Sequence, residues 1–293
     1  MKDKTFNCFK KYILIVANKH YPNIRKRKFS LEYYLDNFLH VLTDVSNWYN
    51  LNLIYKNEKT YHYKSIYNEY NKWSKDGIFE NAFKMFMQEN YFKISKVKQN
   101  KKINLFIDVV KISNKLGSEY VTINGEYRKK NVTQLTVICD QNKLPISVSP
   151  LKINKVIYNG RKTAEDERKN VQNTLNKIPI IIKKDYIKVN LIGDKGYITQ
   201  NKFNVFNKEI KIITPVRKNM KRKNTKKEKL LLKNRYIIEN FFGKLKVYNR
   251  IYVRKEKSYI NYESFIYLAL LMYYFNFIEK NNPALIEKII KMR

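Results

Sequence analysis

The sequence is poor in the residues on which several classes of protein depend. It contains two cysteines, Cys8 and Cys139, and three scattered histidines, His20, His40 and His62. These residues form no motif, so neither a disulfide framework nor a zinc site can be built from them, and a reducing compartment fits best. Only 7 glycines and 6 prolines occur among 293 residues, which argues against fibrous and low-complexity proteins.

Long hydrophobic runs are also scarce. The apolar run from Tyr12 to Ala17 is too short to span a bilayer, and no cleavage-site pattern follows it. The segment from Tyr262 to Lys280 is apolar but contains Glu263 and many tyrosines, which predicts a buried helix rather than a membrane span. We therefore expect no targeting segment and no membrane partner. Hydrophobic residues still make up 44% of the chain, enough for one large or two modest domains.

Acidic residues are few, because 25 Asp and Glu stand against 60 Lys and Arg, for a net charge of +35. An AT-rich gene inflates lysine, but Asp and Glu codons are also fairly AT-rich, so base composition alone does not explain the asymmetry. A polyanionic partner explains it better, and nucleic acid is favoured because no basic amphipathic helix suggests a membrane surface. Two candidate phosphate-contacting arms are Arg25, Lys26, Arg27 and Lys28, and the segment from Lys218 to Lys229, an expected flexible loop that includes Lys221, Arg222 and Lys223.

The first 95 residues have the periodicity of helices. Apolar residues recur every three or four positions from Leu31 to about Lys84, and Lys75-Asp76-Gly77 predicts a turn between two helices. These helices are compatible with a helix-turn-helix-like DNA-binding unit. They are equally compatible with an ordinary bundle, in which the core is formed by the aromatic residues Tyr67, Tyr70, Trp73 and Phe79.

The pattern changes after Ser95 to strands mixed with helices, which predicts an α/β domain with antiparallel and parallel strands. The basic segment from Lys218 to Lys229, which is poor in apolar residues, precedes the last expected helix of this region. The expected elements are a strand at Ile103 to Ile112, a hairpin at Gln134 to Pro150 turning at Asp140 to Lys143, a helix at Lys162 to Ile178, strands at Ile187 to Asp194 and Glu209 to Arg217, and a helix at Leu230 to Lys246.

Three acidic residues on separate elements are candidates for metal chemistry. Asp108 interrupts an apolar strand, where a charge is costly unless it is paired or bound to metal, although an edge strand could point it to solvent. Asp194 ends a strand, where α/β sheets place ligands, although Asp and Gly also favour turns. Glu239 lies four residues after Arg235 and seven before Lys246, so the three would share one helical face, although a simple surface ion pair would have the same spacing.

Taken in order, these segments resemble the IS5-type insertion-sequence transposases, which are DDE enzymes. The order of the motifs is more specific than any single one, and the resemblance covers most of the chain. The matching segments are Ile66 to Phe83, Phe106 to Glu119, Thr136 to Val148, Leu191 to Tyr197, and Arg235 to Lys257.

The resemblance implies an RNase H-like catalytic domain, a mixed sheet flanked by helices, at residues 96–280. A small helical DNA-binding region would occupy residues 1–95, and residues 281–293 would form a tail. Asp108, Asp194 and Glu239 would be the catalytic triad and would bind Mg²⁺ or Mn²⁺. DNA would be contacted by Arg235, Lys195 and Lys246, together with the two basic arms.

The implied activity is cleavage and strand transfer at the ends of a mobile element. Its partners would be double-stranded DNA, the terminal inverted repeats and target DNA, and a homodimer is expected because two ends must be held together. A bacterial protein of this kind would be cytoplasmic, whereas a eukaryotic or viral one would need access to the nucleus or viral factory.

The sequence departs from the family pattern at two places. Leu232 stands where the family's Glu motif usually has Tyr, and Leu135 to Val137 lacks the usual Lys/His pair. Two other functions therefore stay open. One is a non-catalytic DNA-binding protein derived from a transposase, and the other is an RNase H-like nuclease that cuts DNA without joining it.

Overall fold

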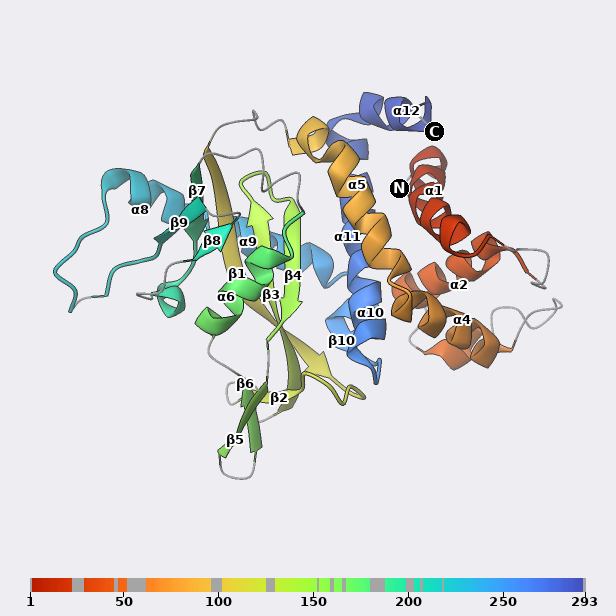
Figure 1. Cartoon of the computed structure of the whole chain (residues 1–293), viewed down its shortest axis with the longest axis horizontal. Helices are drawn as coiled ribbons and strands as arrows, with labels where there is room; N and C mark the ends of the chain where they lie inside the picture. The colour runs from red at the N-terminus through yellow and green to blue at the C-terminus, as the bar shows by residue number, and fades with distance from the viewer. Residues whose placement is uncertain are drawn as a thin grey trace. The chain divides into compact units, whose positions relative to one another are not determined.

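The computed structural model describes residues 2–22, 29–44, 47–51, 62–95, 102–124, 130–151, 153–158, 161–164, 167–179, 188–198, 203–205, 208–217 and 219–291. The chain forms two compact units (Figure 1). The helical unit contains Met1–Ile94, Lys115–Glu119 and Leu245–Arg293, and the sheet unit contains Ser95–Asn114 and Tyr120–Lys244. The sheet unit begins at Ser95, and the DNA-binding and catalytic roles expected on either side of that residue stay predictions. Residues 245–280, which the sequence assigned to the catalytic domain, pack instead with the N-terminal helices.

The sheet unit is built on a mixed sheet in the order β2-β3-β1-β7-β9-β8, with β4 also paired to β3. The central strand β1 is antiparallel to β3 and parallel to β7, and β7 is parallel to β9. The strands are β1 (Lys102–Asn114), β2 (Thr122–Asn124), β3 (Lys130–Asp140), β4 (Pro145–Pro150), β7 (Lys188–Ile192), β8 (Asn204–Val205) and β9 (Lys208–Ile213).

Helix α6 (Glu167–Asn176) packs on β3 and β4 through polar contacts that fix it on the sheet. Ser147 Oγ donates to the carbonyl oxygen of Thr174 at 2.6 Å, and Asn170 Nδ2 donates to Thr136 Oγ1 at 2.9 Å. In Figure 1, α6 lies in front of the sheet and α9 (Tyr236–Leu245) behind it. A mixed sheet flanked by helices fits the RNase H-like fold that the resemblance implied.

The expected strands and hairpin are confirmed in position, but the strand expected at Glu209 to Arg217 ends at Ile213, and two expected helices are wrong in extent. The helix expected from Lys162 begins only at Glu167, because Arg161–Ala164 forms strand β6, which pairs with β5 (Ile153–Tyr158). The helix expected from Leu230 to Lys246 is two helices, α8 (Lys226–Lys233) and α9. Asn234 and Arg235 form a turn between them, so Arg235 precedes α9 and Lys246 follows its end.

The helical unit packs around the long buried helix α11 (Tyr259–Asn281). Tyr70 is fully buried and stacks on Phe265 of α11 with ring centroids 4.5 Å apart. The other elements are α1 (Asp3–His20), α2 (Leu31–Thr43), η2 (Trp48–Asn50), α4 (Tyr63–Lys75), α5 (Ile78–Ser95), α10 (Asn249–Tyr252), β10 (Val253–Arg254) and α12 (Pro283–Lys291). The residues expected to form a C-terminal tail are therefore largely helical. Within the described residues, no helix combines the length and apolarity needed to cross a bilayer.

The turn between α4 and α5 agrees with the sequence. Gly77 has a φ of +69°, a left-handed conformation that glycine adopts without a steric penalty. Trp73 and Phe79 on either side are buried, so these aromatic residues belong to the core of a helical bundle. DNA binding by the same helices stays a prediction.

Candidate active site

Asp108 lies in the middle of the central strand β1, opposite Val137 of β3. The neighbouring residue Ile107 is buried, but the Asp108 side chain keeps 23% of its exposure. Its Oδ1 accepts a hydrogen bond from the Val109 N–H at 2.8 Å, and its Oδ2 lies 3.4 Å from Arg235 Nη2. The carboxylate is therefore half-buried and ion-paired, rather than pointing freely to solvent from an edge strand.

Asp194 lies in a tight turn two residues after β7, the neighbour of β1. It caps the short 3-10 helix Lys195–Tyr197, and its Oδ1 accepts a hydrogen bond from the Gly196 N–H at 2.7 Å. Gly193 has no room for a side chain, since a Cβ there would lie 2.7 Å from Tyr197 Cδ2 and 3.2 Å from Ile107 Cγ2. Gly193 thus lets the turn, and with it Asp194, fit closely against β1.

Glu239 is exposed in the first turn of α9, while Ile238 and Phe241 on the same helix are buried. The N-terminal turn of a helix favours a carboxylate because the helix dipole is positive there. Arg235 forms its ion pair with Asp108 rather than with Glu239, although the i,i+4 spacing allowed the latter. Arg235 Nε is buried without a hydrogen-bond partner in the described structure.

The three acids are electrostatically coupled. The pKa of Asp108 is raised, mainly because the carboxyl group is buried, and the Val109 N–H and the Arg235 guanidinium oppose this shift. The negative charges of Asp194 and Glu239 both add to the increase, so both lie near enough to act on Asp108. β1, the turn after β7 and α9 thereby bring carboxylates that are far apart in sequence to one neighbourhood of the sheet unit.

The chemistry of these donors suits a hard divalent cation, which prefers carboxylate oxygen and needs only one or two carboxylates alongside other oxygen ligands. A bound cation would offset the repulsion that the negative charges of Asp194 and Glu239 exert on the Asp108 carboxylate. In the described part of the chain, however, no three His, Cys, Asp or Glu side chains are arranged as a metal-binding group. Ion binding at this site would therefore require the side chains to reorient, beginning with the Arg235 pair.

The predicted DNA-contacting residues are distributed unequally. Lys195 is exposed directly after Asp194, while Lys246 is half-buried and belongs to the helical unit. The cluster of Arg25, Lys26, Arg27 and Lys28 lies outside the described residues.

The second basic arm is not the free loop that the sequence predicted. Its C-terminal part is the helix α8, which begins with a capping box between Thr225 and Glu228. Arg222 Nη2 lies 2.6 Å from Glu228 Oε1, so one of the three expected DNA-binding cations is already ion-paired. Lys221 and Lys223 are exposed.

Sequence reasoning missed Glu228 and its partner Lys211, whose Nζ lies 2.9 Å from the Glu228 carboxylate. Two cations and the capping hydrogen bonds lower the pKa of Glu228 to about 2. The Thr225-x-x-Glu228 spacing of a capping box was a readable signal for this helix start. The Lys211 pair, by contrast, depends on the position of β9 beside α8 and has no local signal.

Comparison with known families places this geometry in context. Residues 164–259, roughly a third of the chain, match a family model described as a transposase DDE domain. The matched segment includes Asp194 and Glu239, whereas Asp108 lies before it. Comparisons with curated proteins and with solved structures found no match. The similarity supports a DDE transposase and does not distinguish the IS5 type.

Proposed function

We propose that the protein is a transposase that cleaves DNA at the ends of a mobile element and transfers the cut strand to target DNA. The observation that carries the proposal is the placement of Asp108 on β1, Asp194 in the turn after the adjacent strand β7, and Glu239 in the first turn of α9, near enough for the two other charges to act on Asp108. Similarity to a transposase DDE domain over residues 164–259 supports the same function independently of that geometry. The IS5 subtype rests on the resemblance of the sequence motifs alone.

Asp108, Asp194 and Glu239 would hold Mg²⁺ or Mn²⁺. When bound, such ions neutralise charge on the phosphate and lower the pKa of water. In the first step a water oxygen bonds to phosphorus and the P–O3′ bond breaks, which leaves a 3′-OH and a 5′-phosphate. In the second step that 3′-oxygen bonds to a target phosphorus and displaces the target's own 3′-oxygen as a hydroxyl.

Several basic residues would serve these steps. Lys195 follows Asp194 and would contact a phosphate of the bound strand, and Arg235 would turn from Asp108 to the DNA when cations bind. We also propose binding of terminal inverted repeats by the N-terminal helices and assembly of a homodimer, because strand transfer needs two ends in one complex. In a bacterial host the protein would act in the cytoplasm, and in a eukaryotic or viral setting it would need access to the nucleus or viral factory.

The test uses the full chain and labelled duplexes that carry the element ends. Wild-type protein with Mg²⁺ or Mn²⁺ should produce nicked and joined strands. Asp194→Asn should lower both products by at least about a hundredfold, because a ligand of the cations that would neutralise the reacting phosphate is lost. Binding measured with EDTA should change little.

The matched control is Glu287→Gln, which removes an exposed carboxylate from α12 in the helical unit. Cleavage by this variant should equal that of the wild type. Undiminished cleavage by Asp194→Asn would contradict the proposed site, whereas products that are nicked but never joined would identify a nuclease.

A second function, DNA binding without catalysis, is favoured by the contact between Arg235 and Asp108 and by the absence of a ready three-ligand group among the described residues. The departures at Leu232 and at Leu135 to Val137 point the same way. Wild-type protein that binds the duplexes tightly but yields no product with either ion would support this function.

A further inference from the structure

The charged residues of the segment from Ile210 to Lys233 are almost all cationic. It contains ten lysines and arginines and one acid, Glu228. Glu228 is buried, with only 4% of its side chain exposed. The one negative charge of this segment is therefore buried, and the charged side chains that the segment exposes in the described structure are all positive.

Glu228 connects three parts of the segment. Its Oε1 contacts Lys211 of β9 at 2.9 Å and Arg222 of the loop at 2.6 Å. Its Oε2 accepts a hydrogen bond from the Thr225 N–H at 3.1 Å, which completes the cap of α8. One carboxylate thus ties the edge of the sheet, the loop and the helix start together.

The base of the loop is closed by Asn224 in addition. Asn224 Oδ1 accepts a hydrogen bond from the Val216 N–H at 3.0 Å, and Asn224 Nδ2 donates to the Thr214 carbonyl oxygen at 3.0 Å. The stretch from Thr214 to Thr225, which we name the basic loop, is therefore held at both ends in its described residues, 214–217 and 219–225. A loop held in this way loses little conformational entropy when it binds.

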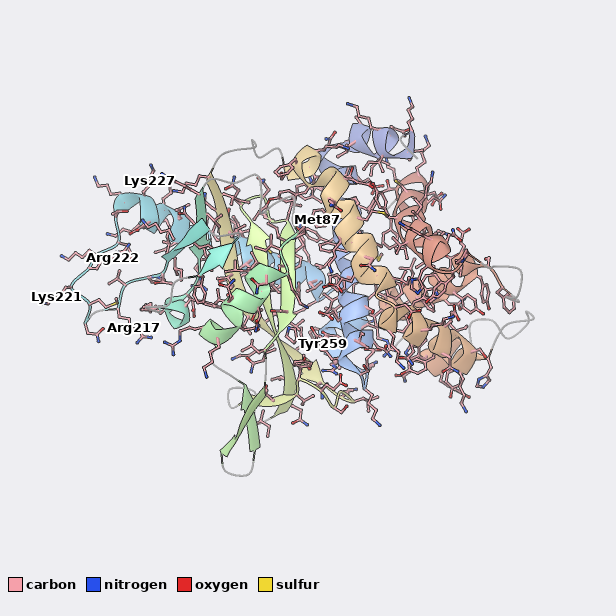
Figure 2. The ribbon with its side chains drawn as sticks, viewed as in Figure 1. Met87, Arg217, Lys221, Arg222, Lys227 and Tyr259 are labelled. Carbon is pink, nitrogen blue, oxygen red and sulfur yellow. The ribbon has the colours of Figure 1, made fainter. Side chains whose placement is uncertain are left out.

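The exposed cations of this region lie along the loop and the following helix. Figure 2 shows Lys221 at the outer part of the basic loop, with Arg217 on the loop and Lys227 on α8. All three side chains belong to exposed residues. Arg222 is directed differently, since it is the loop's contact with Glu228.

We propose that Glu228 is a positioning residue for DNA: it holds the basic loop in a fixed shape, so that Arg217, Lys221 and Lys227 contact successive backbone phosphates. Arg222 and Lys211 serve the loop's structure rather than the contact. The inference rests on the DNA partner of the proposed function and adds which cations bind and what orders them. It needs neither the triad nor cleavage.

Loss of the Glu228 negative charge should weaken DNA binding, which is the reverse of the usual effect. Removing a negative charge from a DNA-binding protein normally strengthens binding, because less repulsion opposes the phosphates. Glu228→Gln should do the opposite. Glutamine keeps the capping box, because Gln also serves at this position, but it loses the attraction to Lys211 and Arg222 that holds the loop.

The experiment measures binding of the full chain to a labelled duplex of arbitrary sequence, in EDTA, over a range of salt concentrations. For Glu228→Gln we expect affinity to fall roughly tenfold at 0.1 M salt, and the slope of log K against log salt to decrease by about 1 to 2, the loss of one or two phosphate contacts. Lys221→Ala and Lys227→Ala should each decrease the slope by about 1.

Glu287→Gln is the matched control, because it removes one exposed carboxylate from helix α12 of the helical unit. Its affinity should equal or slightly exceed that of the wild type. If Glu228→Gln binds as tightly as Glu287→Gln with an unchanged slope, the proposal is overturned. Because no cleavage is measured, an inactive triad would leave this comparison intact.

A second variant covers the case in which Glu228→Gln fails to fold. Asn224→Ala opens the base of the basic loop but leaves every charge in place, so a fall in affinity and slope can only come from lost order. Trypsin should then cut after Arg217 and Lys221 faster than in the wild type. Wild-type affinity with accelerated cutting would refute the requirement for a held loop.

Discussion

Asp108 of the candidate active site and Glu228, which holds the basic loop, are both paired with arginine, yet the pKa values of the two carboxylates are shifted in opposite directions. Glu228 has two cations and a capped helix around it, and its pKa falls to about 2. Asp108 has one arginine at 3.4 Å, a buried position and two acidic neighbours, and its pKa rises. The difference shows that an ion pair with arginine does not by itself determine the direction of a carboxylate's pKa shift, because burial and the other neighbouring charges also contribute.

A third carboxylate, in the helical unit, completes the comparison. Glu256 and Arg250 are almost fully buried at 3.2 Å, and burial raises the pKa of Glu256 despite the arginine. Burial is the largest influence on the pKa of Glu256. At Glu228 the partner cations and hydrogen bonds outweigh burial and lower the pKa, and among these three carboxyl groups only Asp108 has acidic neighbours that raise its pKa further.

The largest expected effect is at Asp108, where stability and activity should change in opposite directions. A raised folded-state pKa means that the ionised carboxyl destabilises the fold, and the cost appears as pH rises above the unfolded value. Asp108→Asn should abolish cleavage and raise the melting temperature by a few degrees at pH 7. The gain should vanish below pH 4, measured by calorimetry, and a lower melting temperature at pH 7 would refute the electrostatic account.

Breaking the pair in the helical unit should have the next largest effect. Arg250→Met removes the guanidinium that contacts the buried Glu256 carboxylate, which should cost about 3–5 kcal/mol of unfolding free energy. The double change with Glu256→Gln should recover most of that loss, because no unpaired charge remains. Urea denaturation followed by circular dichroism measures both, and equal losses in the two variants would show that packing, rather than charge, is responsible.

Acid should release the basic loop. Because the pKa of Glu228 is lowered from 4.5 to about 2, its stabilisation is present above pH 4.5 and is lost as pH falls through 2. Glu228→Gln should therefore cost about 2 kcal/mol at pH 6, less than the full shift implies because its partner cations are exposed. Denaturation at pH 6, 4 and 2 should show the difference between wild type and variant shrinking at each step, to a small remainder at pH 2.

The smallest expected effect tests the turn that carries Asp194. Gly193→Ala places a Cβ 2.7 Å from the Tyr197 ring and should cost about 1–2 kcal/mol through overpacking. Gly243→Ala is the matched control, because a Cβ there meets nothing within 4 Å and alanine favours the helix. Melting temperatures of the two variants should move in opposite directions, and cleavage should fall only in Gly193→Ala.

Much of the sheet unit could be predicted because its strands are buried. Apolar runs reported β1, β7 and β9, and the turn at Asp140 followed from local chemistry, since its Oδ1 accepts hydrogen bonds from the N–H groups of Asn142 and Leu144. The positions of Asp108 and Asp194 on a strand and after a strand were also readable. Their electrostatic coupling was not, because it depends on strand order and on the placement of α9.

The errors arose where tertiary packing overrides local sequence. The break at Asn234 and Arg235 has neither glycine nor proline to signal it, so α8 and α9 read as one helix. The basic loop looked free because its order comes from Glu228 and Lys211, on separate elements. Residues after Leu245 were assigned by proximity in sequence, whereas their apolar helix α11 packs with α1 and α4.

The interleaved path of the chain has a consequence for synthesis on the ribosome. The helical unit needs residues from both ends, because α1 and α4 pack on α11, whereas nearly all of the sheet unit is contained between Ser95 and Lys244. As translation proceeds, the sheet unit can finish folding while the N-terminal helices still wait for their last partner. A frameshift after codon 244 would leave their apolar faces uncovered, and such shortened products should aggregate.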